Sequence, residues 1–151
     1  MKKTVLPLIL ASAFFSAQNF TRVDSLKGSN TSFRDFWDVK KYELSVEPDM
    51  VTQKVSGRNT ITFEIIKDVV NPVFQIDLQQ PMTYKITDSS EKLCTSRRDG
   101  DFIFIETKRT YKKGERHSFT INFTGNPTIA KNAPWDGGWV FKKDENGNPF
   151  V

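Results

Sequence analysis

Apolar and polar side chains alternate along most of the chain from Lys41 onward. In the first run, Tyr42, Leu44 and Val46 alternate with polar or charged residues until Pro48 ends the pattern. Later runs place at alternating positions the apolar residues Val55, Ile61, Phe63 and Ile65, then Phe74, Ile76 and Leu78, then Tyr84 and Ile86, and finally Phe119, Ile121 and Phe123. Strict alternation is typical of strands with one buried and one wet face, as in antiparallel sheets. We therefore predict an all-β fold in which these apolar side chains face the core.

Turn-forming residues separate the runs. Pro81 ends the third run, Asp99-Gly100 is a favoured hairpin turn, and Lys113-Gly114 turns the chain again. The segment Phe102–Ile105 is apolar on both faces, which predicts a central strand. Beyond residue 17, no stretch shows the helical spacing of apolar positions. Short alternating strands joined by turns predict an antiparallel sandwich or a strongly bent sheet.

The end of the sequence predicts a hairpin. Trp139–Phe141 has the character of a strand that enters a turn at Asn146-Gly147-Asn148, and Pro149–Val151 begins the returning strand. A hairpin that stops on its return leaves an apolar end and an unpaired edge. We therefore expect the fold to be incomplete at its C-terminus, with further polypeptide beyond Val151 in the whole protein.

The beginning of the sequence has the pattern of a signal peptide. Lys2 and Lys3 precede the apolar stretch Val5–Phe15, and Ser16-Ala17-Gln18 offers a cleavage point. This stretch is too short to span a bilayer of about 30 Å. We predict a signal peptide at residues 1–17, export to the periplasm or medium without membrane insertion, a flexible polar lead-in at residues 18–35, and a β domain at residues 36–151.

Composition and charge narrow the function classes. Hydrophobic residues make up 37% of the chain, with 13 Phe, which is enough for one core and argues against disorder. The net charge is +4, and loss of Lys2 and Lys3 with the signal peptide leaves 20 basic against 18 acidic residues, or +2. The remaining basic residues fall at strand edges and turns, as solvated residues do, so nucleic acid is not an expected partner.

The residues that could carry chemistry are few. His117 is the only histidine, and H-E-x-x-H does not occur, whereas catalytic zinc normally takes three protein ligands. His117 falls on the same alternating positions as Phe119, so we expect it to cap the inward face near a strand start. Cys94 is the only cysteine and forms no intrachain disulfide. A Cys94–His117 nucleophile is less favoured than a half-buried structural thiol. We assign no catalytic, cofactor-binding or metal-binding residue to this chain.

One loop stands out. Trp135, Asp136, Gly137, Gly138 and Trp139 combine two glycines, which adopt backbone conformations that other residues resist, with two large aromatic side chains. Such a loop suits contact with a carbohydrate, a peptide or a neighbouring domain, and a packed turn explains the same residues equally well.

Several motifs follow one another in a set order. They are Asp38-x-x-x-Tyr42-x-Leu44-x-Val46, the segments 55–63, 75–81 and 119–125 with Gly114 ahead of the last, the segment 133–139, and Asn146-Gly147-Asn148-Pro149. Together they resemble the opening of the aminopeptidase N family of zinc metallopeptidases, the gluzincins that include leukotriene hydrolase. The resemblance spans about Phe36 to Val151, and the last loops are similar to those of bacterial secreted members.

The resemblance implies a saddle-like N-terminal β domain that packs on a thermolysin-like catalytic domain. It also implies that the whole enzyme removes N-terminal amino acids from peptides with a zinc-bound water, a glutamate base and a G-x-M-E-N loop. None of those motifs occurs in this sequence. Zinc is therefore expected only in the full-length enzyme, and the expected partners are the missing catalytic domain and, in the full enzyme, peptides.

Two main hypotheses follow. The first is a non-catalytic N-terminal domain of an exported zinc aminopeptidase, with the 135–139 loop near the domain contact. The alternative is a free-standing exported β-sandwich module that binds a peptide or glycan through that loop. A cysteine-based enzyme using Cys94 is a third and weaker reading.

Overall fold

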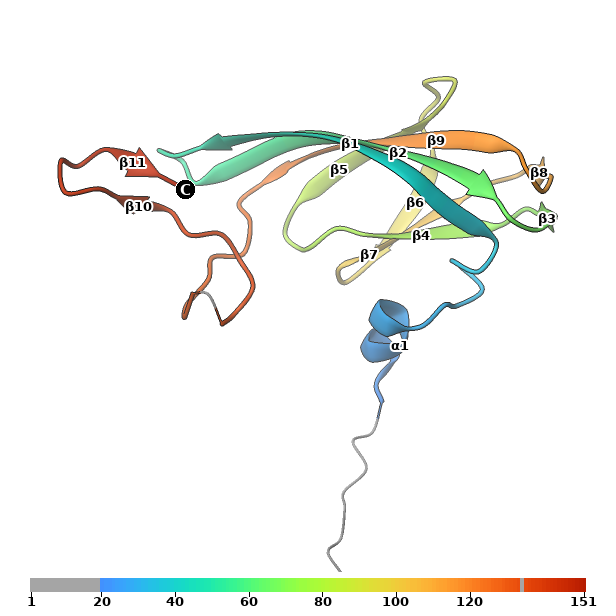
Figure 1. Ribbon diagram of the computed structural model, residues 1–151, viewed down its shortest axis with the longest axis horizontal. Coiled ribbons are helices and arrows are strands. Elements are labelled where there is room, and N and C mark those ends of the chain that lie inside the picture. Colours follow the sequence, from blue (N-terminus) through green and yellow to red (C-terminus); the bar gives the residue numbers. More distant parts are fainter. Residues whose placement is uncertain (1–19, 134) are drawn as a thin grey trace, which may run out of the picture.

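The structure is a computed structural model that describes residues 20–133 and 135–151, so the predicted signal peptide lies outside the described residues. Its largest element is a four-stranded antiparallel sheet with the order β1-β2-β9-β5. The strands are β1 (Trp37–Asp49), β2 (Lys54–Ile65), β5 (Thr83–Asp88) and β9 (Arg116–Gly125). Figure 1 shows these strands running as one long, twisted layer.

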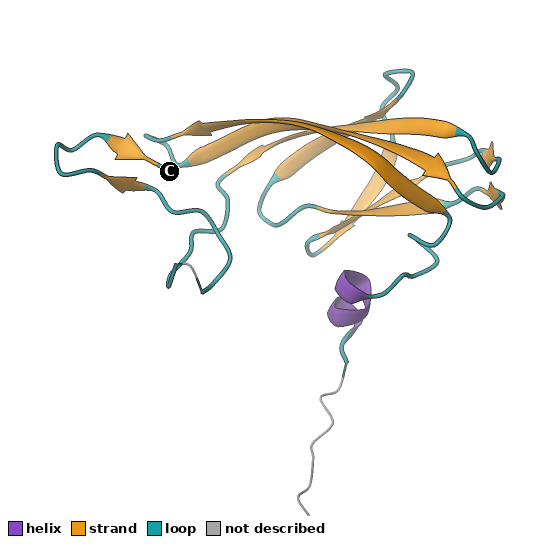
Figure 2. Cartoon of the chain, in the orientation of Figure 1, coloured by secondary structure: helices purple, strands orange, loops and turns teal. Residues whose placement is uncertain are grey.

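A smaller antiparallel sheet has the order β4-β7-β6. It is built from β4 (Val73–Asp77), β6 (Thr95–Asp99) and β7 (Phe102–Glu106). Two short ribbons complete the strands: β3 (Val69–Val70) pairs with β8 (Thr110–Tyr111), and β10 (Lys142–Lys143) pairs with β11 (Pro149–Phe150). Figure 2 shows how strands dominate the described chain, which confirms the all-β antiparallel prediction.

The core lies where the small sheet packs on one half of the large sheet. Phe63 on β2 and Phe74 on β4 are both fully buried, with ring centroids 5.2 Å apart. Phe119 on β9 lies 5.0 Å from each of these two rings. Aromatic pairs of this kind contribute about 0.5–1.5 kcal/mol each beyond the burial of their surface. The alternating positions of β2, β4 and β9 thus meet in one cluster, as their periodicity predicted.

The central strand of the small sheet is buried on both faces. All four residues from Phe102 to Ile105 are buried, as predicted. Ile103 and Ile105 belong to the core between the sheets, while Phe102 and Phe104 belong to a second cluster on the outer side. That second cluster is completed by Leu26, so a strand that is apolar on both faces is covered on both faces.

Leu26 comes from a short helix where the sequence indicated no regular element. Helix α1 (Arg22–Gly28) lies within the polar segment 18–35, and Thr21 and Asp24 cap it reciprocally. The Gln75 side chain is 1% exposed and donates a hydrogen bond to the Leu26 carbonyl at 2.9 Å. With one buried side chain in seven residues, α1 carries no periodic stripe that a sequence pattern could detect.

The prediction that Tyr42, Leu44 and Val46 are buried is wrong. Their exposed fractions are 62%, 62% and 39%. They do share one face with the core residues of β2, because Tyr42 lies opposite Ile61, which is 6% exposed. The small sheet covers only the other half of that face (Figure 1). We call the uncovered surface made by Tyr42, Leu44 and Val46 of β1 with the half-buried Phe123 of β9 the open face.

The C-terminal hairpin forms, but its first strand begins later than predicted. Strand β10 is Lys142–Lys143, whereas Trp139 makes a parallel bridge to Ile129. Trp139 donates its N–H to the Thr128 carbonyl at 2.8 Å, which ties this residue to the preceding loop rather than to the hairpin. The Asp144 carboxylate organises the hairpin turn by accepting hydrogen bonds from backbone N–H groups.

Gly57 provides a test of this architecture. A Cβ added there would lie 2.4 Å from Cζ of Phe123 and 2.6 Å from the Ser45 carbonyl oxygen, a backbone atom that cannot move freely. We expect Gly57→Ala to lower the free energy of unfolding by about 1–3 kcal/mol. Gly137→Ala is the control, because nothing lies within 4 Å of its added Cβ. Equal stability of the two variants in urea unfolding would contradict the close approach of β1, β2 and β9.

Candidate functional site

His117 sits near the start of β9, on the inward face, as predicted. It lies opposite Phe63 in the register, and its side chain is 16% exposed. Its Nε2 is 3.0 Å from Oε2 of Glu115, and this hydrogen bond lowers the pKa of the Glu115 carboxyl. The Tyr111 ring packs edge-on against the imidazole with centroids 5.0 Å apart. Packing and one carboxylate therefore account for this histidine.

These residues do not fit a zinc ion. A metal site needs several converging donors, and the Glu115 carboxylate faces the Arg109 guanidinium at 3.9 Å as well as His117. Across residues 20–133 and 135–151, no three His, Cys, Asp or Glu side chains are grouped closely enough to hold a metal. We derive no metal chemistry from this chain.

Cys94 is half-buried beside the core, and its environment suppresses thiol reactivity. Burial first, and the nearby Asp88 carboxylate second, raise the pKa of the Cys94 thiol to about 11. Its Sγ lies 3.8 Å from the Lys92 carbonyl, while His117 contacts Glu115 instead. A nucleophile pair requires a base against the sulfur and a lowered pKa, so the geometry favours the structural reading of Cys94.

The loop of residues 135–139, here called the tryptophan loop, is held closed by hydrogen bonds from backbone groups. Asp136 accepts hydrogen bonds from the N–H groups of Lys131 at 2.7 Å and Asn132 at 2.8 Å, and the Asn132 bond lowers the pKa of the Asp136 carboxyl. Gly138 has φ +146° and passes so close to Ala130 that an added Cβ would lie 2.7 Å from its nitrogen. Both the carboxylate and this glycine are therefore needed to shape the loop.

The two tryptophans of this loop differ in environment. Trp139 is half-buried and stacks on Phe141, with centroids 6.0 Å apart and planes inclined by 16°. Trp135 is 90% exposed. Packing of the loop thus explains Trp139 and Gly138, and it leaves Trp135 as the side chain available to a partner. Its role in a domain contact stays a prediction.

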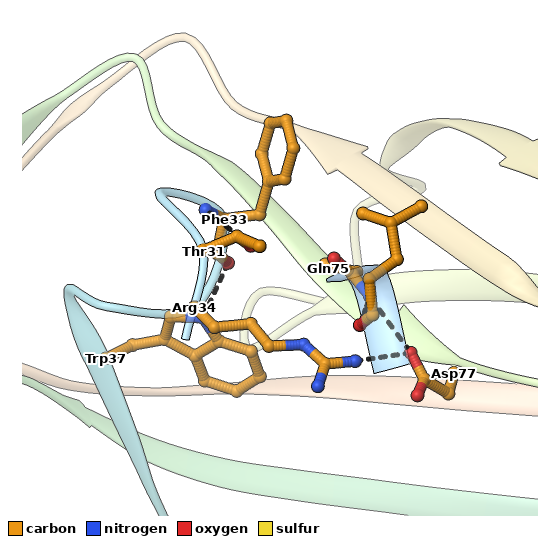
Figure 3. Close-up of polar contacts among 7 residues, drawn as sticks. Thr31, Phe33, Arg34, Trp37, Gln75 and Asp77 are labelled. Carbon is orange, nitrogen blue, oxygen red and sulfur yellow. Dashed lines mark hydrogen bonds and ion pairs between the residues drawn. The ribbon is translucent and has the colours of Figure 1, made fainter. Parts of the chain in front are cut away.

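A groove that the sequence did not indicate runs between the sheets beside the open face. Its volume is about 500 Å³, and Trp37, Tyr42 and Phe123 contribute to its aromatic wall. Arg34 lines it and pairs with Asp77 at 2.6 Å, as Figure 3 shows. The Trp37 indole donates to the Phe33 carbonyl at 3.0 Å, which holds the ring in this wall. We call this space the inter-sheet groove.

Asn59 is the polar residue of this groove that the alternation could have revealed. It stands between Gly57 and Ile61 at an inward position of β2, opposite Leu44 on β1 and Ile121 on β9. Its buried Oδ1 has no hydrogen-bond partner among the described residues. The sequence signal is a polar residue at a position where the alternation otherwise places apolar residues. Such a residue stands out because a buried oxygen without a hydrogen-bond partner is costly.

Solved structures of other proteins share the fold of this chain. The chain superposes with a TM-score of 0.54 and 16% identity on an M1 zinc metallopeptidase from Deinococcus radiodurans, in a mutant form bound to a Tyr-Ser-Ala substrate. A second structure of an M1 zinc metallopeptidase from this organism gives a TM-score of 0.53 and 17% identity. The chain has the fold of part of an M1 zinc metallopeptidase.

The match is partial on both sides. It covers 67% of this chain and 23% of the substrate-bound metallopeptidase, and 66% and 22% in the second case. No protein-family model matches the sequence, and no curated protein matches it. At these identities the likeness to M1 metallopeptidases concerns the fold alone. Within the described residues, α1 is the one helix and is far too short to cross a membrane.

The thiol environment gives a direct prediction. With a pKa of about 11 against an ordinary value of 9.0, Cys94 carries about a hundredfold less thiolate at pH 8. We therefore expect alkylation of the folded chain by iodoacetamide to be about a hundredfold slower than alkylation of the urea-unfolded chain. Labelling is followed by mass spectrometry, and rapid alkylation of the folded protein at pH 8 would point instead to a reactive cysteine.

Proposed function

We propose that this chain is the non-catalytic N-terminal β domain of an exported zinc aminopeptidase. In this role it packs on a catalytic domain of the same polypeptide and shapes the entrance for peptides. The fold likeness supports the proposal, since the match covers about a quarter of the M1 metallopeptidase chains and leaves the larger part of such an enzyme unaccounted for. The open face supports it independently.

The open face is the observation that carries the proposal. Three large apolar side chains of β1 lie in a row with exposed fractions of 39–62%, on the same face that builds the core farther along the sheet. Contiguous exposed apolar surface marks an interaction site, and burying one Leu or Val side chain contributes about 1.5–3 kcal/mol. A domain that packs there would continue the core that the small sheet begins.

Zinc, in this proposal, is held outside the chain. His117 and Cys94 are separately engaged, and the described carboxylates are not grouped as ligands. What the chain supplies is an aromatic wall, with Trp37 and Phe123 packed against the core and Tyr42 beside them. A wall of this kind fits the shaping of a peptide entrance rather than the reaction itself.

The alternative is a free-standing exported module that binds a peptide or glycan. One observation favours it, the 90% exposure of Trp135 in this closed loop. An aromatic ring of this kind suits stacking on a sugar face. If the alternative holds, Trp135→Ala removes glycan or peptide binding by the chain alone, whereas the domain hypothesis expects no such binding to remove.

The first test concerns activity. We expect the purified chain, supplied with zinc and aminoacyl p-nitroanilides, to release no chromophore above the buffer rate, because it presents no grouped metal ligands among the described residues. The DNA beyond the Val151 codon should continue in frame and encode H-E-x-x-H. Turnover by the chain alone, or a stop codon there, would overturn the proposal.

The second test concerns the open face. When the following part of the polypeptide is produced separately, we expect it to bind this chain, and Leu44→Ser to weaken the binding at least about tenfold, because an apolar contact is lost. Ser45→Ala is the matched control, since Ser45 is the next residue of β1 and its side chain points to the opposite face. Equal effects of the two substitutions in calorimetry would argue against packing on this face.

A further inference from the structure

Strand β1 forms an unpaired edge of the large sheet. Among the described residues it pairs with β2 alone, and it stands at one end of the order β1-β2-β9-β5. Every residue from Lys40 to Glu47 is exposed. A long exposed edge presents backbone N–H and C=O groups that can pair with another strand. The edge is therefore a binding surface distinct from the side chains of the open face.

Two features protect the ends of this edge and leave its middle free. The register of β1 on β2 shifts between Val39 and Lys41, which marks a bulge, and Pro48 has no N–H to donate. Bulges and prolines are devices that block edge pairing. The unprotected stretch is therefore the seven residues 41–47, and its centre is Leu44.

The backbone direction within this stretch follows from Ser45. Its carbonyl oxygen points towards β2, since it would lie 2.6 Å from a Cβ on Gly57. Hydrogen-bonding groups alternate in direction along an antiparallel strand. The N–H and C=O groups of Tyr42, Leu44 and Val46 therefore point away from β2, towards the open edge.

We propose that the β1 edge pairs with the β1 edge of a second copy of this chain, antiparallel, about a two-fold axis at Leu44. In this register Leu44 lies opposite its own copy, and Tyr42 lies opposite Val46 of the second chain. The outward groups of these residues form about six hydrogen bonds across the axis. Aromatic and β-branched side chains are a favourable cross-strand pair, so the open faces of the two copies join into one apolar surface.

Charge on the outer face selects this register. Lys41 lies opposite Glu47 of the second copy, and the two-fold axis forms that ion pair twice. A parallel arrangement in register would place Lys41 against Lys41 and Glu43 against Glu43. Moving the two-fold axis to Glu43 would place Glu43 opposite its own copy. Moving the axis to Ser45 would place Glu43 opposite Glu47. Like charges directly opposite are destabilising, and of these four arrangements only the axis at Leu44 avoids them.

The ion pair that Lys41 makes within its own chain competes only weakly with the proposed pairing between two copies. Lys41 pairs with Glu43 at 2.9 Å, but both side chains are more than half exposed, and exposed pairs of this kind contribute little. The proposal does not rest on the proposed function, because it concerns the backbone edge and outer charges rather than packing on the open face. Failure of one leaves the other standing.

Charge reversal tests the pairing by sedimentation equilibrium of the purified chain over a concentration series. We expect the native chain to dimerise, and Lys41→Glu and Glu47→Lys each to raise the dissociation constant at least about tenfold, because two attractive pairs become repulsive. A mixture of these two variants should associate again, since each Glu then meets a Lys. The doubly reversed variant should likewise regain the native dimer.

The control is Lys85→Glu, an exposed charge on β5 at the opposite edge, which should leave dimerisation unchanged. A native chain that stays monomeric to about 1 mM would overturn the proposal. So would a dimer that is indifferent to the single reversals, which would point to contact through the open face, or single variants that fail to associate when mixed.

Discussion

The contact between Phe63 and Phe74 joins the two sheets, and the rest of the structure depends on it. Neither ring is exposed, and they come from different sheets with centroids 5.2 Å apart. Trp37 lies 5.2 Å from the first ring and 5.5 Å from the second, so the start of β1 is anchored at the same point. With a single cysteine in the sequence, no intrachain disulfide supplements this cluster, and apolar packing must hold the layers together.

Where the second layer ends, the large sheet continues alone. A sheet one layer thick buries neither of its faces, and its apolar residues gain little from folding until something covers them. The inter-sheet groove marks this boundary, with Ile121 still buried, Phe123 half-buried and Leu44 exposed along one face. The exposure of the open face is therefore a consequence of sheet size, since Leu44 and Val46 are as apolar as the side chains of the core.

This explains which features the sequence could predict. Alternation correctly assigned faces, because the parity of Ile61, Phe63 and Tyr42 follows from strand geometry alone. It could not decide which part of a face is covered, because coverage depends on where the small sheet of β4, β6 and β7 comes to lie. Helix α1 was not predicted for a similar reason. Its single buried residue, Leu26, gains its contacts only when Gln75 and Phe104 are brought beside it by the tertiary structure.

The candidate site shows the same division between local and long-range information. The inward orientation of His117 could be predicted because it falls on the same alternating positions as Phe119. Its partner Glu115 is two residues away in sequence. The groove residues Arg34 and Asp77 are 43 positions apart and meet only through tertiary structure. Asn59 lies between these cases, since its inward parity was visible in the alternation whereas its unpartnered oxygen was not.

Strand β1 separates its two surfaces by residue parity. Tyr42, Leu44 and Val46 give their side chains to the open face and their backbone groups to the free edge, whereas Lys41 and Glu47 direct side chains to the outer face and backbone groups to β2. A substitution at an even position therefore disturbs both surfaces, while a charge change at an odd position acts on edge pairing alone. A covering domain and an edge partner therefore compete only if their bulk collides, and edge pairing can be weakened by charge changes that leave the side chains of the open face intact.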